Sequence, residues 1–532
     1  MSGDVNVVSA EEAVAVIKDG DTVATGGFVG IGVAEEILIA IDERFQKSRH
    51  PRDLTLVYAA GQGDGANRGL NHFGHEHLVR RVIGGHWGLV PKVQQLALDN
   101  KIDAYNFPQG VISQMFRDIA AKRPRSISKI GLHTFVDPRL SGGRINQKTT
   151  DELVEVIEFD GEEYLSYRTF PIDVAIIRGT TADVDGNISM EKEALDIESL
   201  AIAMAAHNSG GTVIVQVERI ASRNTIGPRT VKIPGILVDY VVVSRPENHC
   251  QTFAEAYNPT YSGEVKVPLD RLAPMAMGAR KIIARRAVFE LSRGDVVNLG
   301  IGMPEGIAQV AAEENMLDDL TLTAEPGVIG GVPSSGLSFG AAANVVALID
   351  QPSQFDLYDG GGLDIAFLGL AQADRNGNLN VSKFGSRFAG AGGFINISQC
   401  AGKVVFVGTF TAVGLKISVY DGQLVIDQEG RVKKFVDQVE HTTFSGRFAQ
   451  AENRSVLYIT ERCVFRLGAQ GLELVEVAPG IDIERHILSQ MGFEPIIAGP
   501  PGLMHRSIFS PEVMNSGATA AVSHHQHKGV TL

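Results

Sequence analysis

One block of sequence occurs twice in the chain, and this repeat restricts the possible folds more than any other feature. Residues 172–187 resemble residues 363–378. Three positions recur at a constant offset of 191 residues: Asp173, Asp183 and Gly186 return as Asp364, Asp374 and Gly377. Such internal similarity is typical of a duplicated structural unit, so we expect two related halves.

A second, shorter match precedes the first one in both halves. Residues 20–26 and 294–300 each read as a turn, a short apolar strand and a glycine-rich corner, and helix-like runs follow at 34–45 and 306–316. Chance can produce one short match, but several matches in the same order favour a common architecture. Strands that alternate with helices indicate an α/β fold.

The length of the chain agrees with two domains. Its 532 residues exceed what one hydrophobic core usually serves. Residues 246–274 are rich in proline, asparagine and polar side chains, and we interpret them as a linker. The predicted domains are residues 1–245 and residues 275–532.

Continuous apolar runs predict strands that are buried on both faces, as in parallel sheets covered by crossover helices. Examples are residues 213–217, 237–243 and 404–407. The predicted fold class is α/β, with two related open domains that have mainly parallel sheets covered by helices.

Charge and composition exclude several classes of protein. The net charge is −14, whereas nucleic-acid binding needs a basic face. The apolar stretch 23–41 is interrupted by glycines and two glutamates, so we expect no membrane span. The first residues lack a signal-peptide pattern, and the three cysteines match no metal-ligand spacing. A histidine-rich segment, 524–527, is interpreted as a solvated tail. We expect a cytoplasmic protein without a metal site.

Glycine-rich corners suggest nucleotide binding, but their spacing does not fit it. Gly300, Gly302 and Gly306 are spaced one residue too widely for the dinucleotide fingerprint, and no P-loop sequence occurs. Such a corner still lets a ligand approach the backbone at the start of a helix.

Ser338 lies in a formal G-x-S-x-G sequence at 336–340, the pattern of a nucleophile elbow. The elbow needs a strand directly before the serine, and residues 332–335 contain a proline and two serines, which make a poor buried strand. A packing loop is the favoured interpretation, and a serine hydrolase is the alternative.

Glu325 follows an apolar run, 320–324, and opens a Pro/Gly corner. Open α/β sheets place their ligand crevices at the carboxyl ends of strands, and the glycines would leave this carboxylate open to a bulky reactant. A carboxylate in such a place can act as a general base or as a nucleophile. The residues alone do not choose between these roles, nor do they exclude a solvated loop glutamate.

Several segments together resemble the family I coenzyme A transferases, especially the single-chain type that acts on acetate and propionate. The resemblance spans nearly the whole chain, and its segments are specific only in combination: 26–28, 84–88, 107–110, 134–139, 300–304, 325–327, 381–385, 390–394 and 428–434. It implies an enzyme that moves coenzyme A from an acyl-CoA to a short-chain carboxylic acid, with no cofactor other than these substrates. Homo-oligomers are common in this family, so we expect a homodimer or a homotetramer.

The resemblance also implies roles for particular residues. Glu325 matches the family's nucleophile, which carries coenzyme A as a thioester. Gln109 and Gly393 match the two donors that stabilise the oxyanion, with Gly392 as an alternative to Gly393. Pro326 departs from the family, and it removes a backbone donor beside the nucleophile. The residues expected to contact coenzyme A are Gly392, Gly300, Gly302 and Lys383.

Three other functions stay open at this point. A serine esterase or thioesterase would use Ser338. A non-catalytic protein on the same fold would bind acyl-CoA without transfer, and a relative of citrate lyase would depend on an acyl carrier protein.

Overall fold

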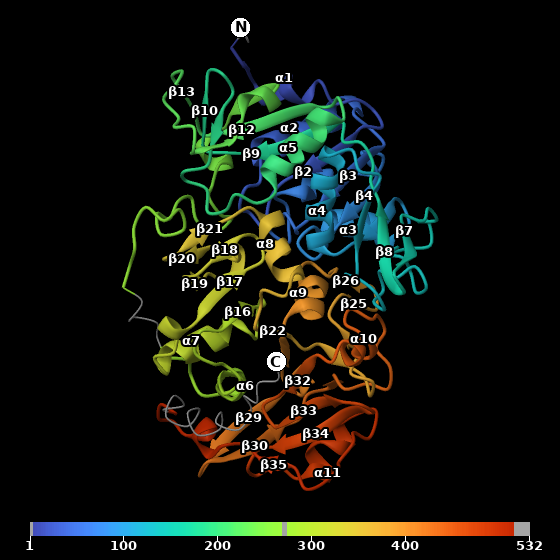
Figure 1. The fold of residues 1–532 in the computed structure, drawn as a ribbon, viewed down its shortest axis with the longest axis vertical. Coiled ribbons are helices and arrows are strands. Elements are labelled where there is room, and N and C mark those ends of the chain that lie inside the picture. The colour runs from blue at the N-terminus through green and yellow to red at the C-terminus, as the bar shows by residue number, and fades with distance from the viewer. Residues whose placement is uncertain (1–3, 269–273, 515–532) are drawn as a thin grey trace. The chain divides into compact units, whose positions relative to one another are not determined.

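The computed structural model describes residues 4–268 and 274–514 (Figure 1). The chain divides into two compact units. Unit 1 comprises Met1–Val267, Ala324–Gly360 and Ser382–Asn396, and unit 2 comprises Pro268–Thr323, Gly361–Val381 and Ile397–Leu532. Two segments from the second half of the sequence therefore belong to unit 1. The predicted domain boundaries divide the chain by sequence alone and stay a prediction. The histidine-rich segment 524–527 lies outside the described residues.

Unit 1 is built on an eight-stranded sheet in which every neighbouring pair of strands is parallel. In sheet order its strands are β1 (Asn6–Val8), β15 (Tyr240–Val243), β12 (Thr212–Val217), β9 (Val174–Arg178), β2 (Thr22–Thr25), β3 (Leu54–Tyr58), β4 (Val79–Gly84) and β5 (Asp103–Asn106). The expected strand at 237–243 is shorter in the structure, because Gly235–Leu237 forms a 3-10 helix, η2.

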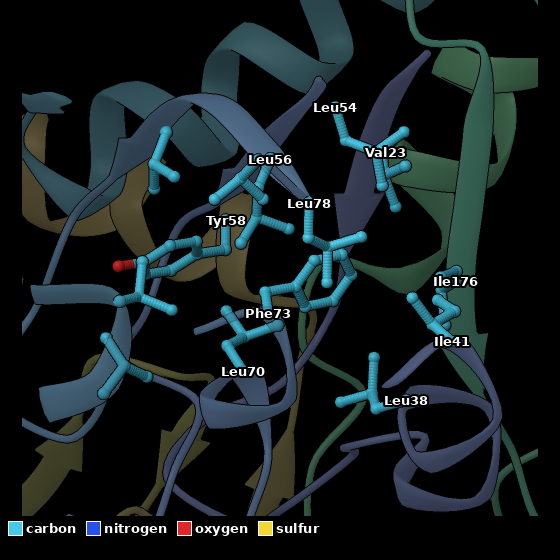
Figure 2. Packing of buried hydrophobic residues seen from close by; sticks show 14 of the residues in the cluster. Val23, Leu38, Ile41, Leu54, Leu56, Tyr58, Leu70, Phe73, Leu78 and Ile176 are labelled. Carbon is cyan, nitrogen blue, oxygen red and sulfur yellow. The ribbon is translucent and has the colours of Figure 1, made fainter. Parts of the chain in front are cut away.

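Helices cover this sheet, as the continuous apolar strands predicted. The helices of unit 1 are α1 (Ala10–Val14), α2 (Glu35–Ser48), α3 (Pro91–Leu98), α4 (Gln109–Ala120), α5 (Ser199–Asn208) and α8 (Gln351–Asp359), which packs on α4, and α9 (Phe394–Cys400) begins in unit 1. Helix α5 packs on β9, β12 and α4. Residues of α1, α2 and α3 share one buried apolar cluster with strand residues such as Val23, Leu56 and Ile176, which Figure 2 shows at close range.

Smaller sheets complete unit 1. A four-stranded one has the order β13 (Arg219–Ala221), β10 (Thr181–Asp183), β11 (Ile188–Ser189) and β14 (Val231–Ile233). A three-stranded one has the order β6 (Arg125–Ser128), β8 (Glu162–Arg168) and β7 (Val154–Phe159). Two separate antiparallel pairs are β19 (Val332–Pro333) with β20 (Ala342–Ala343), and β25 (Lys383–Phe384) with β26 (Arg387–Phe388).

Unit 2 has a mixed sheet covered by α6 (Ala279–Val288) and α7 (Glu305–Glu313), whose apolar residues share one buried cluster with its strands. The ten strands of this sheet have the order β21 (Ala347–Leu348), β18 (Val328–Ile329), β17 (Thr321–Ala324), β16 (Val296–Leu299), β22 (Ile365–Gly369), β27 (Lys403–Val407), β32 (Ser455–Ile459), β33 (Cys463–Gly468), β34 (Gly471–Val477) and β35 (Gly502–Leu503), and β21 is antiparallel to β18. The pairs from β17 to β32 are parallel, and β33 is antiparallel to both of its neighbours. The protein is thus α/β, with large parallel and mixed sheets flanked by helices.

The repeated sequence block has the same local structure in both units. The carboxylate of Asp183 accepts hydrogen bonds from the N–H groups two and four residues further on, at 3.0 and 2.9 Å. Asp374 does the same in unit 2, at 3.0 and 3.1 Å. Gly186 and Gly377 follow with φ angles of +81° and +75°, which glycine adopts without strain.

A further pair of hydrogen bonds joins the two separate sequence matches. The carboxylate of Asp173 accepts the N–H of Thr22 at 2.8 Å, and that of Asp364 accepts the N–H of Val296 at 2.8 Å. Thr22 and Val296 belong to the shorter match, and the two aspartates belong to the longer one. Both matches are therefore parts of one structural unit that occurs twice.

Candidate active site

Glu325 lies in a tight turn at the end of β17. The N–H of Gly327 donates to the carbonyl of Ala324 at 3.1 Å, and the N–H of Ile349 donates to the carbonyl of Gly327 at 2.9 Å. Gly327 has a φ of +119°, and a Cβ at this position would lie 2.0 Å from the Ile349 oxygen, so a larger residue cannot keep the turn. The turn holds the half-buried Glu325 at the carboxyl end of a strand, as the sequence predicted.

Pro326 is compatible with this turn, because the N–H that closes the turn is that of Gly327. Its ring belongs to an apolar wall. A Cβ added to Gly340 would lie 3.4 Å from Pro326 Cγ and 2.5 Å from Phe28 Cδ1, so both rings adjoin Gly340. The rings of Phe28 and Phe339 pack with their centroids 5.8 Å apart. This wall gives the turn rigid support from one side.

Gln109 is the first residue of α4 and is only 1% exposed. Its backbone N–H donates to the carbonyl of Gly392 at 3.0 Å, and its side-chain Nε2 donates to Oε1 of Gln351 at 3.1 Å. The structure therefore brings the predicted residues Gln109 and Gly392 together. No motif or spacing in the sequence predicted that Gln351 would contact Gln109.

The glycine-rich loop 390–393 is held by hydrogen bonds to the end of β4 and to β5. The N–H of Gly392 donates to the carbonyl of Gly85 at 2.8 Å. Asn106 accepts the N–H of Ala391 at 2.9 Å and donates to the Gly85 carbonyl at 2.6 Å. Gly392 has a φ of +55°, and the buried Gly393 follows directly before α9. The position of Gly393 is therefore fixed by a loop that is itself tightly bound.

His86 lies beside this loop, and the sequence analysis assigned it no role. Burial lowers the pKa of its imidazole to about 4. Nδ1 is buried and has no hydrogen-bond partner within the described part of the chain. Its Cδ2 lies 3.8 Å from the position that a Cβ on Gly392 would take. A neutral imidazole thus borders the loop.

The residues expected to contact coenzyme A are divided between the units. Lys383 lies in unit 1, in the short hairpin of β25 and β26. Gly300 and Gly302 lie in unit 2, between β16 and α7, and the N–H of Gly300 donates to the Phe367 carbonyl at 2.9 Å. Their contacts with coenzyme A stay predictions.

Ser338 does not have the surroundings of a nucleophile elbow. It lies in a 3-10 helix, η5 (Gly336–Ser338), and is 3% exposed. Its hydroxyl is 2.9 Å from Thr252 Oγ1 and 3.4 Å from Glu255 Oε1. An elbow places an accessible serine between a strand and an α-helix, so this serine is a packing residue.

The described residues contain neither a metal-binding group nor a membrane-spanning helix. Within residues 4–268 and 274–514, no group of three or more His, Cys, Asp or Glu side chains is arranged to hold a metal ion. No helix in the same ranges is long and apolar enough to span a bilayer.

Comparisons with known proteins identify the family. The coenzyme A transferase family model matches residues 7–244. A caffeate CoA-transferase of Acetobacterium woodii is 48% identical, over 94% of this chain and 97% of its own length. The acetate CoA-transferase YdiF of Escherichia coli K12 is 43% identical, over 97% of both chains. A crystal structure of YdiF from E. coli O157:H7, a thioester complex with CoA, is 42% identical in sequence and matches with a TM-score of 0.91. The match covers 96% of this chain and 98% of the YdiF chain. The chain therefore belongs to the coenzyme A transferases, in the single-chain type of family I.

Proposed function

We propose that the chain transfers coenzyme A from a short-chain acyl-CoA to a carboxylic acid such as acetate, with Glu325 as the covalent nucleophile. The ionised carboxylate attacks the thioester carbonyl and expels the coenzyme A thiolate, which leaves a mixed anhydride. The thiolate then attacks the glutamyl carbonyl, releases the donor acid as its carboxylate and forms a glutamyl-CoA thioester. The acceptor carboxylate reverses both steps and leaves with coenzyme A.

The observation that carries this proposal is the position of Glu325 in a backbone-bonded turn at the carboxyl end of β17. A 42% identical relative crystallised as a thioester complex with CoA supports the covalent intermediate. The turn also fixes the backbone that carries the Glu325 side chain, and a nucleophile on a fixed backbone reacts faster because less orientational freedom is lost.

Each attack on a carbonyl builds negative charge on its oxygen, and two donors are proposed to stabilise that charge. Gln109 supplies a side-chain N–H, since Nε2 carries two hydrogens and Gln351 accepts only one of them. The N–H of Gly392 is occupied by the Gly85 carbonyl, which supports Gly393 as the second donor. A donor of this kind typically contributes about 10²–10³ in rate.

The acid substrates are proposed from the relatives. Acetate follows from the 43% identical acetate CoA-transferase, and the 48% identical caffeate CoA-transferase makes an aromatic acid the second candidate. Lys383, Gly300, Gly302 and Gly392 are proposed to contact coenzyme A. A cytoplasmic location and a homodimer or homotetramer complete the proposal.

Label exchange tests the function directly. The purified chain is incubated with acetyl-CoA and labelled acetate, or with caffeoyl-CoA and labelled caffeate, and the label in the acyl-CoA is followed. A ping-pong transferase moves label into acyl-CoA without a second acid. We expect exchange in the wild type and in Ser338→Ala, and none in Glu325→Ala. Hydrolysis of acyl-CoA without label exchange would favour a thioesterase. Binding of acyl-CoA without hydrolysis or exchange would favour a non-catalytic protein.

A further inference from the structure

A buried chain of hydrogen bonds connects α8 to the residue proposed as the first oxyanion donor. Gln109 Nε2 donates to Gln351 Oε1 at 3.1 Å, and Gln351 Nε2 donates to Ser113 Oγ at 2.7 Å. Gln109 and Ser113 are four residues apart and lie on one face of α4. The three side chains are 1%, 0% and 0% exposed. Gln351 therefore bridges two successive turns of α4 where water does not compete.

This bridge determines how the Gln109 amide is oriented. If the amide rotated, its Nε2–H bond to Gln351 would break and a buried acceptor would be left unsatisfied, which is costly. The first N–H consequently stays on Gln351, and the second N–H keeps one direction. An oxyanion donor is effective because it is oriented before charge develops, so that orientation has a kinetic consequence.

Gln351 is itself held firmly. Its backbone N–H donates to the carbonyl of Ile197 at 3.0 Å. Two residues earlier, the N–H of Ile349 donates to the carbonyl of Gly327 in the Glu325 turn. A segment of three residues, 349–351, is thus bonded both to the turn of the nucleophile and to the side chain of Gln109.

We propose that Gln351 is a positioning residue for coenzyme A transfer, which acts by orienting the Gln109 amide toward the developing oxyanion. This inference rests on the proposed function of Gln109. It assigns no contact between Gln351 and substrate.

Helix α8 also offers a matched control. Gln354 lies one turn further along the same helix and is 0% exposed, as Gln351 is. Neither atom of its side-chain amide has a hydrogen-bond partner in the described residues. Replacement of either glutamine by methionine removes a buried amide at similar volume, but only Gln351→Met disconnects Gln109.

The test is a double-mutant cycle on steady-state transfer from acetyl-CoA to a second acid, with circular dichroism melting as the check on folding. We expect Gln351→Met to lower kcat by about 10- to 100-fold with KM nearly unchanged, since about 1 Å of misplacement can cost on the order of 10²-fold. Gln354→Met should stay within about 3-fold of the wild type. Gln351→Glu keeps an acceptor oxygen for Gln109 and should retain more activity than Gln351→Met.

The background of Gln109→Ala decides whether Gln351 acts through Gln109. There, Gln351→Met should change kcat by less than about 3-fold, because residues that act as a unit are not additive. The inference would be overturned if the effects of Gln109→Ala and Gln351→Met on kcat multiply. It would also be overturned if Gln351→Met and Gln354→Met lower kcat equally. Wild-type kcat in Gln109→Ala would overturn the proposed role of Gln109 itself. If Gln109→Ala lowers kcat but Gln351→Met keeps the wild-type kcat, the inference about Gln351 is overturned and the proposed role of Gln109 stands.

Discussion

Glu198 is an ionisable side chain at a place that water does not reach. It precedes α5 as the N-cap residue and is 0% exposed. Neither carboxylate oxygen has a hydrogen-bond partner among the described residues. Burial raises the pKa of Glu198 from its ordinary 4.5 to about 8, and the negative charge of Asp350 acts in the same direction. The folded protein therefore holds a proton on Glu198 at neutral pH.

The effect on stability follows from linkage. Between pH 4.5 and about 8 the folded chain keeps this proton and the unfolded chain releases it. The contribution of Glu198 to the free energy of unfolding is therefore fully present below pH 4.5. It is lost as pH rises toward about 8, by about 1.4 kcal/mol per pH unit. Over the whole interval the loss is on the order of 3–5 kcal/mol. Glu198→Gln preserves the shape of the neutral acid and has no proton to lose.

The assay compares denaturant unfolding of wild type and Glu198→Gln between about pH 5 and 9. The advantage of the variant should grow with pH and level off above about pH 8. Glu158→Gln, at an exposed position on β7, serves as the control and should give a small, constant difference. A difference between Glu198→Gln and wild type that is independent of pH, or that shrinks as pH rises, would show that the folded chain does not hold a proton on Glu198 at neutral pH.

Two further substitutions test other parts of the structure. Gly327→Ala should lower kcat for transfer by more than about 10-fold, because its Cβ would meet the Ile349 oxygen at 2.0 Å. The control Gly361→Ala, also at positive φ but with open space around it, should have little effect on kcat. Arg178→Met should destabilise unit 1 by about 3–5 kcal/mol in calorimetric or denaturant unfolding, because it removes the guanidinium 3.1 Å from the 2% exposed Glu193 carboxylate and leaves that carboxylate only the longer contacts with Thr180 and His249, at 3.4 and 3.5 Å. An unchanged unfolding profile would show that the Arg178–Glu193 pair contributes nothing.

The features that the sequence predicted correctly are local ones. The turns at Asp183 and Asp374 depend on bonds to backbone groups only two and four residues away, so residue type and spacing suffice to reveal them. The glycine corner after Glu325 is local in the same sense. Parallel strands covered by helices could be predicted because strands buried on both faces need continuous apolar runs.

The features that the sequence did not predict depend on long-range contacts. Gln109 and Gln351 are 242 positions apart, and no periodicity or spacing connects them. His86 was noted only as part of a resembling segment, because it packs against glycines that lie far from it in the sequence, such as Gly392. The assignment of residues 324–360 and 382–396 to unit 1 likewise reflects tertiary contacts that leave no mark in composition.

Intact-mass measurement after incubation with acyl-CoA alone shows directly whether Glu325 carries coenzyme A. We expect a coenzyme A adduct that peptide mapping places on Glu325 and that borohydride removes by reducing the thioester. Gln354→Met should form this adduct, and Glu325→Ala should not. Absence of any adduct under turnover conditions, or an adduct that persists in Glu325→Ala, would show that Glu325 is not the covalent nucleophile.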